Sequence, residues 1–293
     1  MDWAPEHEIR TEQAARLIAT QFPALAALPV VPLATGWDNS VFTVGDAWAF
    51  RFPRRETALP GIRREISLLP LLARRLPLPV PVPELLGVPA ESFPWPFTGN
   101  RFVHGAELFS LRDDQRAPAA ADLGSFLRAL HDVRDRGRDL PVDPLRRTDP
   151  AARIARTQPH VEAIAHLWQP DEAVRALYEE ACGLPPWSGE PVLVHGDLHL
   201  RHLLVAPDGA ATGVIDWGDV CLADASVDLM LVYGGFTGTA RDAFFDAYGP
   251  VTRAQELRAR VLSVGVCAAL AVSAPEASAL QHEALRGLVR SVS

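Results

Sequence analysis

The chain of 293 residues contains no lysine, so all 28 of its basic side chains are arginine. Any role that needs a permanent positive charge therefore belongs to a guanidinium, which stays charged at every ordinary pH. Cysteine is also scarce. Cys182, Cys221 and Cys267 are odd in number and far apart, which argues against a disulfide framework and against a CxxC metal site. We expect three buried thiols.

Long apolar runs are absent as well. No segment approaches the roughly eighteen apolar residues of a membrane span, and the first residues have neither the basic nor the apolar region of a signal peptide. We therefore expect a cytoplasmic protein with no membrane partner. The net charge is −8 and no basic run exceeds two residues, which argues against a nucleic-acid partner and weakly favours a cationic small molecule.

The most informative stretch runs from Val192 to Gly218. Apolar triplets at 192–194 and 203–205 flank a polar loop, turn residues follow at 207–209, and a third apolar triplet occupies 213–215. This pattern predicts strand, loop, strand, hairpin turn and strand. Two carboxylates, Asp197 and Asp216, are then delivered to the same end of a small β unit.

Such an arrangement suits phosphoryl transfer, which needs a carboxylate to orient a hydroxyl nucleophile and ligands to hold Mg²⁺ on the nucleotide phosphates. Protein kinases place an Asp in a catalytic loop, an Asn five residues on, and a second Asp before Phe-Gly. Here Asp197 follows His195-Gly196, His202 stands five residues later, and Asp216 begins Asp-Trp-Gly.

The stretch resembles the aminoglycoside phosphotransferases and their relatives, the macrolide phosphotransferases, choline kinases and homoserine kinases. The resemblance implies an α+β, bilobal, protein-kinase-like fold. Residues 1–103 would form an N-lobe with a five-stranded antiparallel sheet and helix C, and residues 104–293 a mostly helical C-lobe. It also implies that Asp197 is the catalytic base and that His202 and Asp216 hold the metal. This chain departs from the family's pattern at His202, where most members carry Asn. Because Mg²⁺ prefers oxygen ligands, the imidazole bears on metal geometry or metal preference.

In the first lobe, apolar patterns at 30–33, 41–44 and 48–52 predict three strands. Arg51 lies between Phe50 and Phe52, and we expect its guanidinium to bind nucleotide phosphate; the alternative is an edge-strand arginine facing water. Glu65 follows fourteen residues later in the predicted helix 57–69, which Pro60 and Pro70 would limit or kink. It would hold Arg51 in register, unless it belongs to a solvated helix face.

Two further segments complete the expected nucleotide site. The loop 35–40 would present backbone N–H groups near Asn39 and Ser40 to phosphate oxygens. Strands at 84–88 and 96–103 lead to a hinge at His104, and the resemblance places the base of ATP or GTP against the backbone of Phe102, Val103 and His104.

The rest of the second lobe reads as helices at 114–133, 151–168, 171–182, 227–232, 240–248, 255–271 and 276–289, with a loop over 135–149. Asp224 is expected to cap a helix. Asp228 is expected to be a structural partner of the catalytic loop.

The predicted function is transfer of the nucleotide γ-phosphate, with Mg²⁺, to a hydroxyl of an antibiotic-like acceptor, an aminoglycoside first of all, by a monomeric resistance enzyme. The alternatives are a macrolide phosphotransferase or other small-metabolite kinase, and a nucleotide-binding pseudokinase without turnover. A further alternative is a zinc hydrolase built on His195, His199 and His202, whose spacing suits a zinc site.

Overall fold

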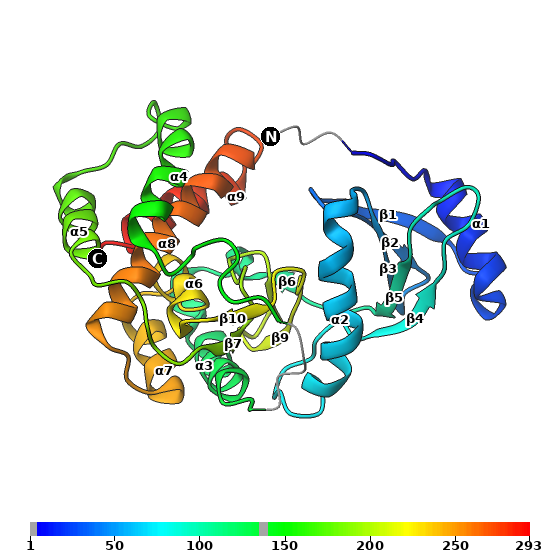
Figure 1. Cartoon of the computed structure of the whole chain (residues 1–293), viewed down its shortest axis with the longest axis horizontal. Helices are drawn as coiled ribbons and strands as arrows, with labels where there is room; N and C mark the ends of the chain where they lie inside the picture. The colour runs from blue at the N-terminus through cyan, green and yellow to red at the C-terminus, as the bar shows by residue number, and fades with distance from the viewer. Residues whose placement is uncertain (1–4, 135–139) are drawn as a thin grey trace. The chain divides into compact units, whose positions relative to one another are not determined.

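The structure is a computed structural model that describes residues 5–134 and 140–293. The chain divides into two compact units: unit 1 contains Met1–Arg74 and Val80–His104, and unit 2 contains Arg75–Pro79 and Gly105–Ser293. Each unit is described by itself, with the elements labelled in Figure 1. Of the loop expected over 135–149, residues 135–139 lie outside the described residues.

Unit 1 is built on a five-stranded antiparallel sheet, as predicted from the sequence. The strand order is β1-β2-β3-β5-β4, with neighbouring strands antiparallel throughout. Two α-helices, α1 (Thr11–Gln21) and α2 (Leu59–Leu72), accompany the sheet. The strands are β1 (Val30–Thr35), β2 (Asn39–Val44), β3 (Trp48–Pro53), β4 (Pro83–Gly87) and β5 (Phe97–Arg101).

The two faces of this sheet bury different kinds of side chain. Phe50 and Phe52 of β3 belong to an apolar cluster with Leu17 and Ile18 of α1. Because side chains alternate along a strand, Arg51 points to the opposite face, where Glu65 of α2 receives it. Figure 1 shows α1 and α2 on opposite sides of the sheet.

Helix α2 differs from the prediction, which had it end or kink at its prolines. Pro60 lies in the first turn, where its missing N–H would be unpaired in any case. The helix continues through Pro70 and ends at Leu72. Leu69 and Leu72 are buried, so their packing offsets the backbone hydrogen bond that Pro70 cannot donate.

Unit 2 is mostly helical, as predicted, with two small sheets. One pairs β7 (Val192–Val194) with β10 (Cys221–Ala223), and the other orders β6 (Ala106–Glu107), β8 (Leu203–Val205) and β9 (Ala211–Val214). Neither β6 nor β10 was predicted, because both strands are very short. The helices are α3 (Ala117–His131), α4 (Pro150–Ala163), α5 (Glu172–Cys182), α6 (Met230–Gly235), α7 (Gly238–Tyr248), α8 (Arg253–Ser273) and α9 (Ala279–Arg290).

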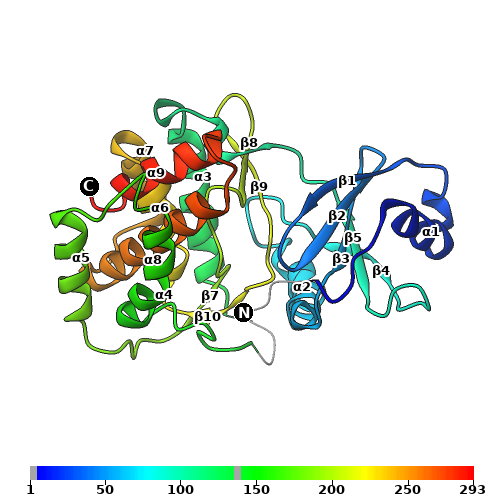
Figure 2. The ribbon, with the colours of Figure 1, turned by 90° about the horizontal axis from the view of Figure 1, so that it is seen from above.

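Helix α8 is the centre of unit 2 and packs against α4, α5, α6 and α9 (Figure 2). Small residues allow the close approach: a Cβ at Gly287 of α9 would lie 2.6 Å from the Cys267 sulfur of α8. Cys221 and Cys267 are buried as predicted, but Cys182 at the end of α5 is exposed. The expected burial of Cys182 was wrong because α5 packs through Val174, Leu177 and Ala181 instead.

A buried ionic cluster fixes α9. The carboxylate of Glu283 is fully buried and accepts hydrogen bonds from Arg116 and from Arg290, each at 2.6 Å. Arg290 also donates to Asp113. Removal of one member would leave a buried charge uncompensated, so the cluster constrains where α9 can pack. None of the described helices combines the length and the apolar character needed to cross a bilayer.

Candidate active site

The small β unit of unit 2 brings the predicted acidic residues together. The chain leaves β7 at Val194, enters a loop that contains Asp197 and His202, and resumes at β8. It leaves β9 at Val214 and reaches Asp216, which takes φ +67°. This left-handed conformation is uncommon outside glycine, and aspartate tolerates it better than most residues. A strained position of this kind is often found at a functional site.

Asp228 anchors the start of the loop, as the sequence predicted. Its fully buried carboxylate accepts hydrogen bonds from the backbone N–H groups of His195 at 2.8 Å and Gly196 at 2.9 Å. His131 donates its Nε2–H to the same carboxylate at 3.2 Å. Burial by itself would raise the pKa of Asp228, but these donors outweigh burial, and its pKa lies below the usual range. The group is therefore a charged structural anchor.

His195 is part of that anchor and is not available to a metal. Its Nε2–H donates to the carbonyl of Ile215 at 3.0 Å, and its Nδ1 accepts the N–H of Asp197 at 3.2 Å. Both ring nitrogens are thus occupied, and burial lowers the pKa of His195 to about 4. A zinc site of His195, His199 and His202 would need one of those nitrogens, so that hypothesis was wrong.

His202 lies between the two acidic residues. Its Nδ1–H donates to the backbone carbonyl of Asp197 at 2.7 Å, so Nε2 is the ring nitrogen that remains to bind a metal. That Nε2 is 3.5 Å from Oδ2 of Asp216. Two ligands of one octahedral ion lie roughly 3 Å apart, since each bond is about 2.1 Å. The donor set of one imidazole nitrogen and one carboxylate therefore fits a divalent ion.

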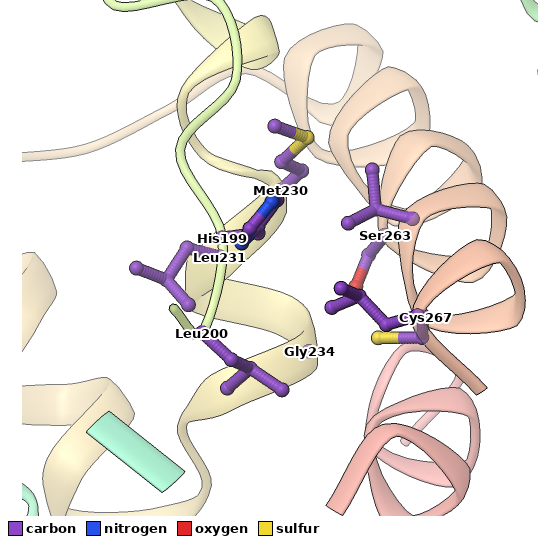
Figure 3. A pocket seen from close by; sticks show the side chains of 9 residues that line it. His199, Leu200, Met230, Leu231, Gly234, Ser263 and Cys267 are labelled. Atoms are coloured by element: carbon purple, nitrogen blue, oxygen red, sulfur yellow. The ribbon is translucent and has the colours of Figure 1, made fainter. Parts of the chain in front are cut away.

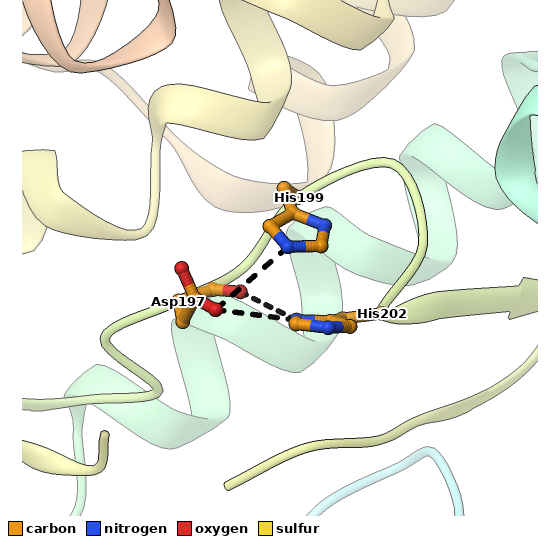
Figure 4. Close-up of side chains that lie close together, drawn as sticks. All are labelled: Asp197, His199 and His202. Carbon is orange, nitrogen blue, oxygen red and sulfur yellow. Dashed lines mark hydrogen bonds and ion pairs between the residues drawn. The ribbon is translucent and has the colours of Figure 1, made fainter. Parts of the chain in front are cut away.

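His199 stacks on His202 and faces Asp197. The ring centroids of the two histidines are 3.7 Å apart, and Nε2 of His199 is 3.7 Å from Oδ2 of Asp197 (Figure 4). Ligand-type atoms of all three residues lie within 4.8 Å of one another. However, Nδ1 of His199 accepts the N–H of Arg201, so its proton is on the Nε2 that faces Asp197. In this tautomer His199 positions the carboxylate and binds no metal.

Asp197 is partly buried, and both positively and negatively charged groups act on its carboxylate. Burial raises the pKa of its carboxyl to about 6, against the opposing effect of His202 and Arg147. About a third of the side chain, 36%, remains accessible to solvent. A carboxylate with a pKa near the working pH and an accessible oxygen can accept a proton from a bound hydroxyl group.

In unit 1, Arg51 and Glu65 form the pair that the sequence suggested. Nη1 of Arg51 is 2.9 Å and 3.0 Å from the two carboxylate oxygens of Glu65. The Glu65 side chain is 2% exposed and that of Arg51 is 12% exposed. The alternatives of a water-facing edge arginine and a solvated helix face were wrong, because β3 is a central strand and Glu65 is on the buried side of α2.

Of the other residues predicted to contact the nucleotide, Asn39 and Ser40 differ from the prediction in their secondary structure. Asn39 and Ser40 lie inside β2 and not at a loop tip, because the turn is confined to residues 36–38. The N–H of Gly36 already donates to the carbonyl of Asn39. Phe102, Val103 and His104 follow the end of β5, where the N–H of Phe102 donates to the Ala47 carbonyl at 2.8 Å.

A model of the phosphotransferase enzyme family matches residues 29–261, which is most of the chain and includes each of these positions. The chain belongs to the phosphotransferase enzyme family.

Solved structures share the fold of this phosphotransferase. The GDP and kanamycin complex of an APH(2") protein aligns at 22% identity with a TM-score of 0.67, over 95% of this chain and 97% of that chain. A GDP complex of aminoglycoside 2'-phosphotransferase-IIIa aligns at 22% identity with a TM-score of 0.69, over 97% of this chain and 98% of that chain. Macrolide 2'-phosphotransferase MphH from Brachybacterium faecium aligns at 21% identity with a TM-score of 0.60, over 95% of this chain and 97% of that chain. The α+β, kinase-like fold expected from the sequence is confirmed.

One curated relative is similar over a short segment. The uncharacterized protein YcbJ of Bacillus subtilis (strain 168) is 42% identical over 45 residues, which cover 15% of this chain and 15% of that protein.

A group of arginines near Asp197 was not predicted from the sequence of the phosphotransferase. Arg147 forms an ion pair with Asp219, with Nη2 and Oδ2 2.5 Å apart. It lies 50 positions before Asp197 in a segment that was expected to be only a charged loop. The one available signal was the pair Arg146-Arg147 beside Asp143, and it did not indicate which acid either arginine would meet.

A small apolar pocket lies behind the catalytic loop (Figure 3). His199 and Leu200 line one side of it, and residues of α6 and α8, such as Met230 and Cys267, line the rest. Its volume of about 10 Å³ corresponds to a single water molecule. The pocket therefore has no room for a substrate.

Proposed function

We propose that the protein transfers the γ-phosphoryl group of ATP or GTP to a hydroxyl group of a small molecule. The supporting observation is the convergence of Asp197, His202 and Asp216 on the loops of one β unit. His202 lies 3.8 Å from a carboxylate oxygen of Asp197 and 3.5 Å from one of Asp216. Two acids and an imidazole in this arrangement match the demands of phosphoryl transfer, which are positioning and charge neutralisation.

Each residue has a defined role in the proposal. Asp197 orients the acceptor hydroxyl and takes its proton, while the acceptor oxygen forms a bond to the γ-phosphorus and the bond from that phosphorus to the bridging oxygen breaks. The nucleoside diphosphate leaves with the bridging oxygen. Nε2 of His202 and the carboxylate of Asp216 would hold Mg²⁺. The ion would neutralise charge on the phosphate oxygens when bound.

Unit 1 supplies the nucleotide contacts in this proposal. Arg51 is the basic side chain that would bind phosphate oxygens in the absence of any lysine, and Glu65 would fix its guanidinium. The backbone of Phe102, Val103 and His104 would contact the nucleobase. Asn39 and Ser40 would lie near the phosphates. We expect the enzyme to act as a cytoplasmic monomer.

An aminoglycoside is the acceptor that the family resemblance suggests, and a macrolide or another small metabolite is the alternative. Structurally similar proteins have been solved in complex with kanamycin, streptomycin and gentamicin. A pseudokinase without turnover would share the fold. It differs in a measurable way, since the unaltered protein would then transfer phosphate to no hydroxyl acceptor.

The test is a transfer assay with labelled ATP and GTP against a panel of hydroxylated acceptors. Asp197→Asn should lower the transfer rate by about a thousandfold, in the range lost when one essential catalytic group is removed, while nucleotide affinity stays within about twofold. Asp242→Asn, at an exposed position of α7, is the matched control and should behave as the unaltered protein. Equal transfer by the Asp197 variant, or none by the unaltered protein, would refute the proposal.

A further inference from the structure

Helix α4 carries a row of basic side chains. Arg153, Arg156 and His160 are separated by three and four residues, so they lie on one side of the helix. The helix is held firmly at this place. Asp149 caps its first turn, and the buried Thr157 packs against Gly265 of α8. The arginines therefore project from a fixed support and not from a loose surface helix.

Arg147 precedes this helix and is deeply buried, with 8% of its side chain exposed. Its position is fixed by Asp143, whose carboxylate accepts the N–H groups of Arg147 at 2.6 Å and Thr148 at 2.9 Å. The segment also pairs with β10, since the N–H of Asp143 donates to the Leu222 carbonyl. Nη2 of Arg147 meets Asp219, but Nη1 is buried without a hydrogen-bond partner among the described residues.

These arginines are close to Asp197. The backbone of Asp219 packs directly on Gly196, where any Cβ would overlap the Asp219 carbonyl oxygen. The pair of Arg147 with Asp219 thus adjoins the residue before Asp197. Arg153 is in the electrostatic field of both Arg147 and Asp197. Arg147 and Arg153 therefore lie near the carboxylate to which we assign the acceptor hydroxyl, and Arg156 and His160 continue the row along α4.

The positive charge at this place is only partly compensated by the protein, since Arg147 pairs with Asp219 and the carboxylates of Asp143 and Asp197 act on Arg153 from a distance. Within residues 5–134 and 140–293, the guanidinium groups of Arg153 and Arg156 have no carboxylate oxygen within 4.0 Å. Nε of Arg153 is buried and unpaired. Burial, together with Arg147 and Arg156, lowers the pKa of Arg153 to about 10. Partly buried cations that repel one another are costly unless an anion is present.

We propose that the acceptor is an anion: a hydroxylated small molecule whose carboxylate or phosphate group is bound by Arg153, Arg156 and Nη1 of Arg147. This rests on the proposed function, because it assigns the chemistry of the acceptor at the same site. Guanidinium groups bind oxyanions through paired hydrogen bonds. A polycationic aminoglycoside would instead add positive charge beside three arginines, so the expected acceptor class changes.

The experiment measures binding and transfer with acceptor pairs that differ in charge. Gluconate is compared with glucose and ribose 5-phosphate with ribose, and kanamycin is included. Affinities are measured by calorimetry on the full chain saturated with a non-hydrolysable nucleotide and Mg²⁺, so that the nucleotide phosphates do not compete. At least one anionic member should bind about tenfold more tightly than its neutral partner. Arg153→Gln and Arg156→Gln should abolish that preference.

Arg175→Gln, an exposed arginine of α5, is the control and should keep the preference intact. The proposal is overturned if kanamycin or the neutral members bind as well as the anions, if no anion binds, or if the preference survives both substitutions. It is also overturned if the substitutions raise the KM for nucleotide instead, since the arginines would then serve the donor. Asp197-dependent transfer to a neutral or cationic acceptor would refute this inference and leave the proposed function standing. Binding of anions without any transfer would refute the proposed function and with it the anion's role as acceptor, and would leave only an anion-binding site at these arginines.

Discussion

At the scale of single residues, the histidines of the loop between β7 and β8 have different hydrogen-bonding roles that their spacing does not reveal. His195 uses both ring nitrogens to hold the backbone. His199 directs an N–H toward Asp197, and His202 alone keeps a ring nitrogen free on the side of Asp216. An imidazole ligand suits Mn²⁺ and later transition metals better than Mg²⁺, which prefers oxygen.

We therefore predict that His202→Asn changes metal preference. An amide oxygen in place of Nε2 should shift the ratio of Mg²⁺ to Mn²⁺ affinity by about tenfold toward Mg²⁺. Displacement of Mn²⁺ by Mg²⁺ from the nucleotide complex, followed by electron paramagnetic resonance, measures this ratio directly. His282→Asn, at an exposed position of α9, is the matched control. An unchanged ratio would mean that His202 is not a ligand.

At the scale of elements, a largely buried ion pair links β3 to α2. The Arg51 side chain lies on the face of β3 opposite the aromatic side chains, where it donates a hydrogen bond to the carboxylate of Glu65. The pair couples the sheet to α2 and also orients the guanidinium that we assign to phosphate. Stability and nucleotide binding should therefore respond together when the pair is altered.

The corresponding prediction concerns Glu65→Gln. Loss of a buried carboxylate beside a largely buried arginine should lower the free energy of unfolding by about 3 kcal/mol. The KM for nucleotide should rise about tenfold because Arg51 is no longer held. Glu84→Gln is the control, since Glu84 and Arg101 are well exposed and 3.5 Å apart, and it should change stability by less than about 1 kcal/mol. Denaturant titration and nucleotide kinetics measure the two effects, and equal behaviour of both variants would contradict the assignment.

At the scale of the whole molecule, the candidate site makes stability depend on pH in two opposing ways. Burial lowers the pKa of His195 to about 4, so its contribution is present above about pH 6.5 and is lost as pH falls through 4. Burial raises the pKa of Asp197 to about 6. Its ionised form therefore destabilises the folded state above pH 6, and this penalty disappears by about pH 4, the value of an unfolded aspartate.

Asp197→Asn should consequently be more stable than the unaltered protein at pH 7. The full shift of two units would correspond to about 3 kcal/mol. Because the side chain is 36% exposed, screening by solvent reduces the expected gain to about 1 kcal/mol. Denaturant unfolding at pH 7 and at pH 4, in the presence of a chelator, tests this, and the gain should vanish at pH 4. The effect of His195 cancels in the comparison. A variant that is less stable at pH 7 would contradict the prediction.

Features that depend on local periodicity could be predicted from the sequence. The spacing of Asp197, His202 and Asp216 between short apolar triplets indicated the catalytic β unit. The alternation of Phe50, Arg51 and Phe52 indicated a charged residue opposite an aromatic face. Such patterns are visible because strand geometry fixes which neighbours share a side.

Features that depend on contacts between distant residues could not be predicted in this way. Burial of Leu69 and Leu72 carries α2 through Pro70, hydrogen bonds select the tautomers of His195 and His202, and Arg147 reaches Asp219 from 72 positions away. Each outcome depends on which groups meet in space and how far water is excluded from them. A local sequence pattern specifies neither the contacts between distant groups nor the exclusion of water, because both are set by the packing of the whole chain.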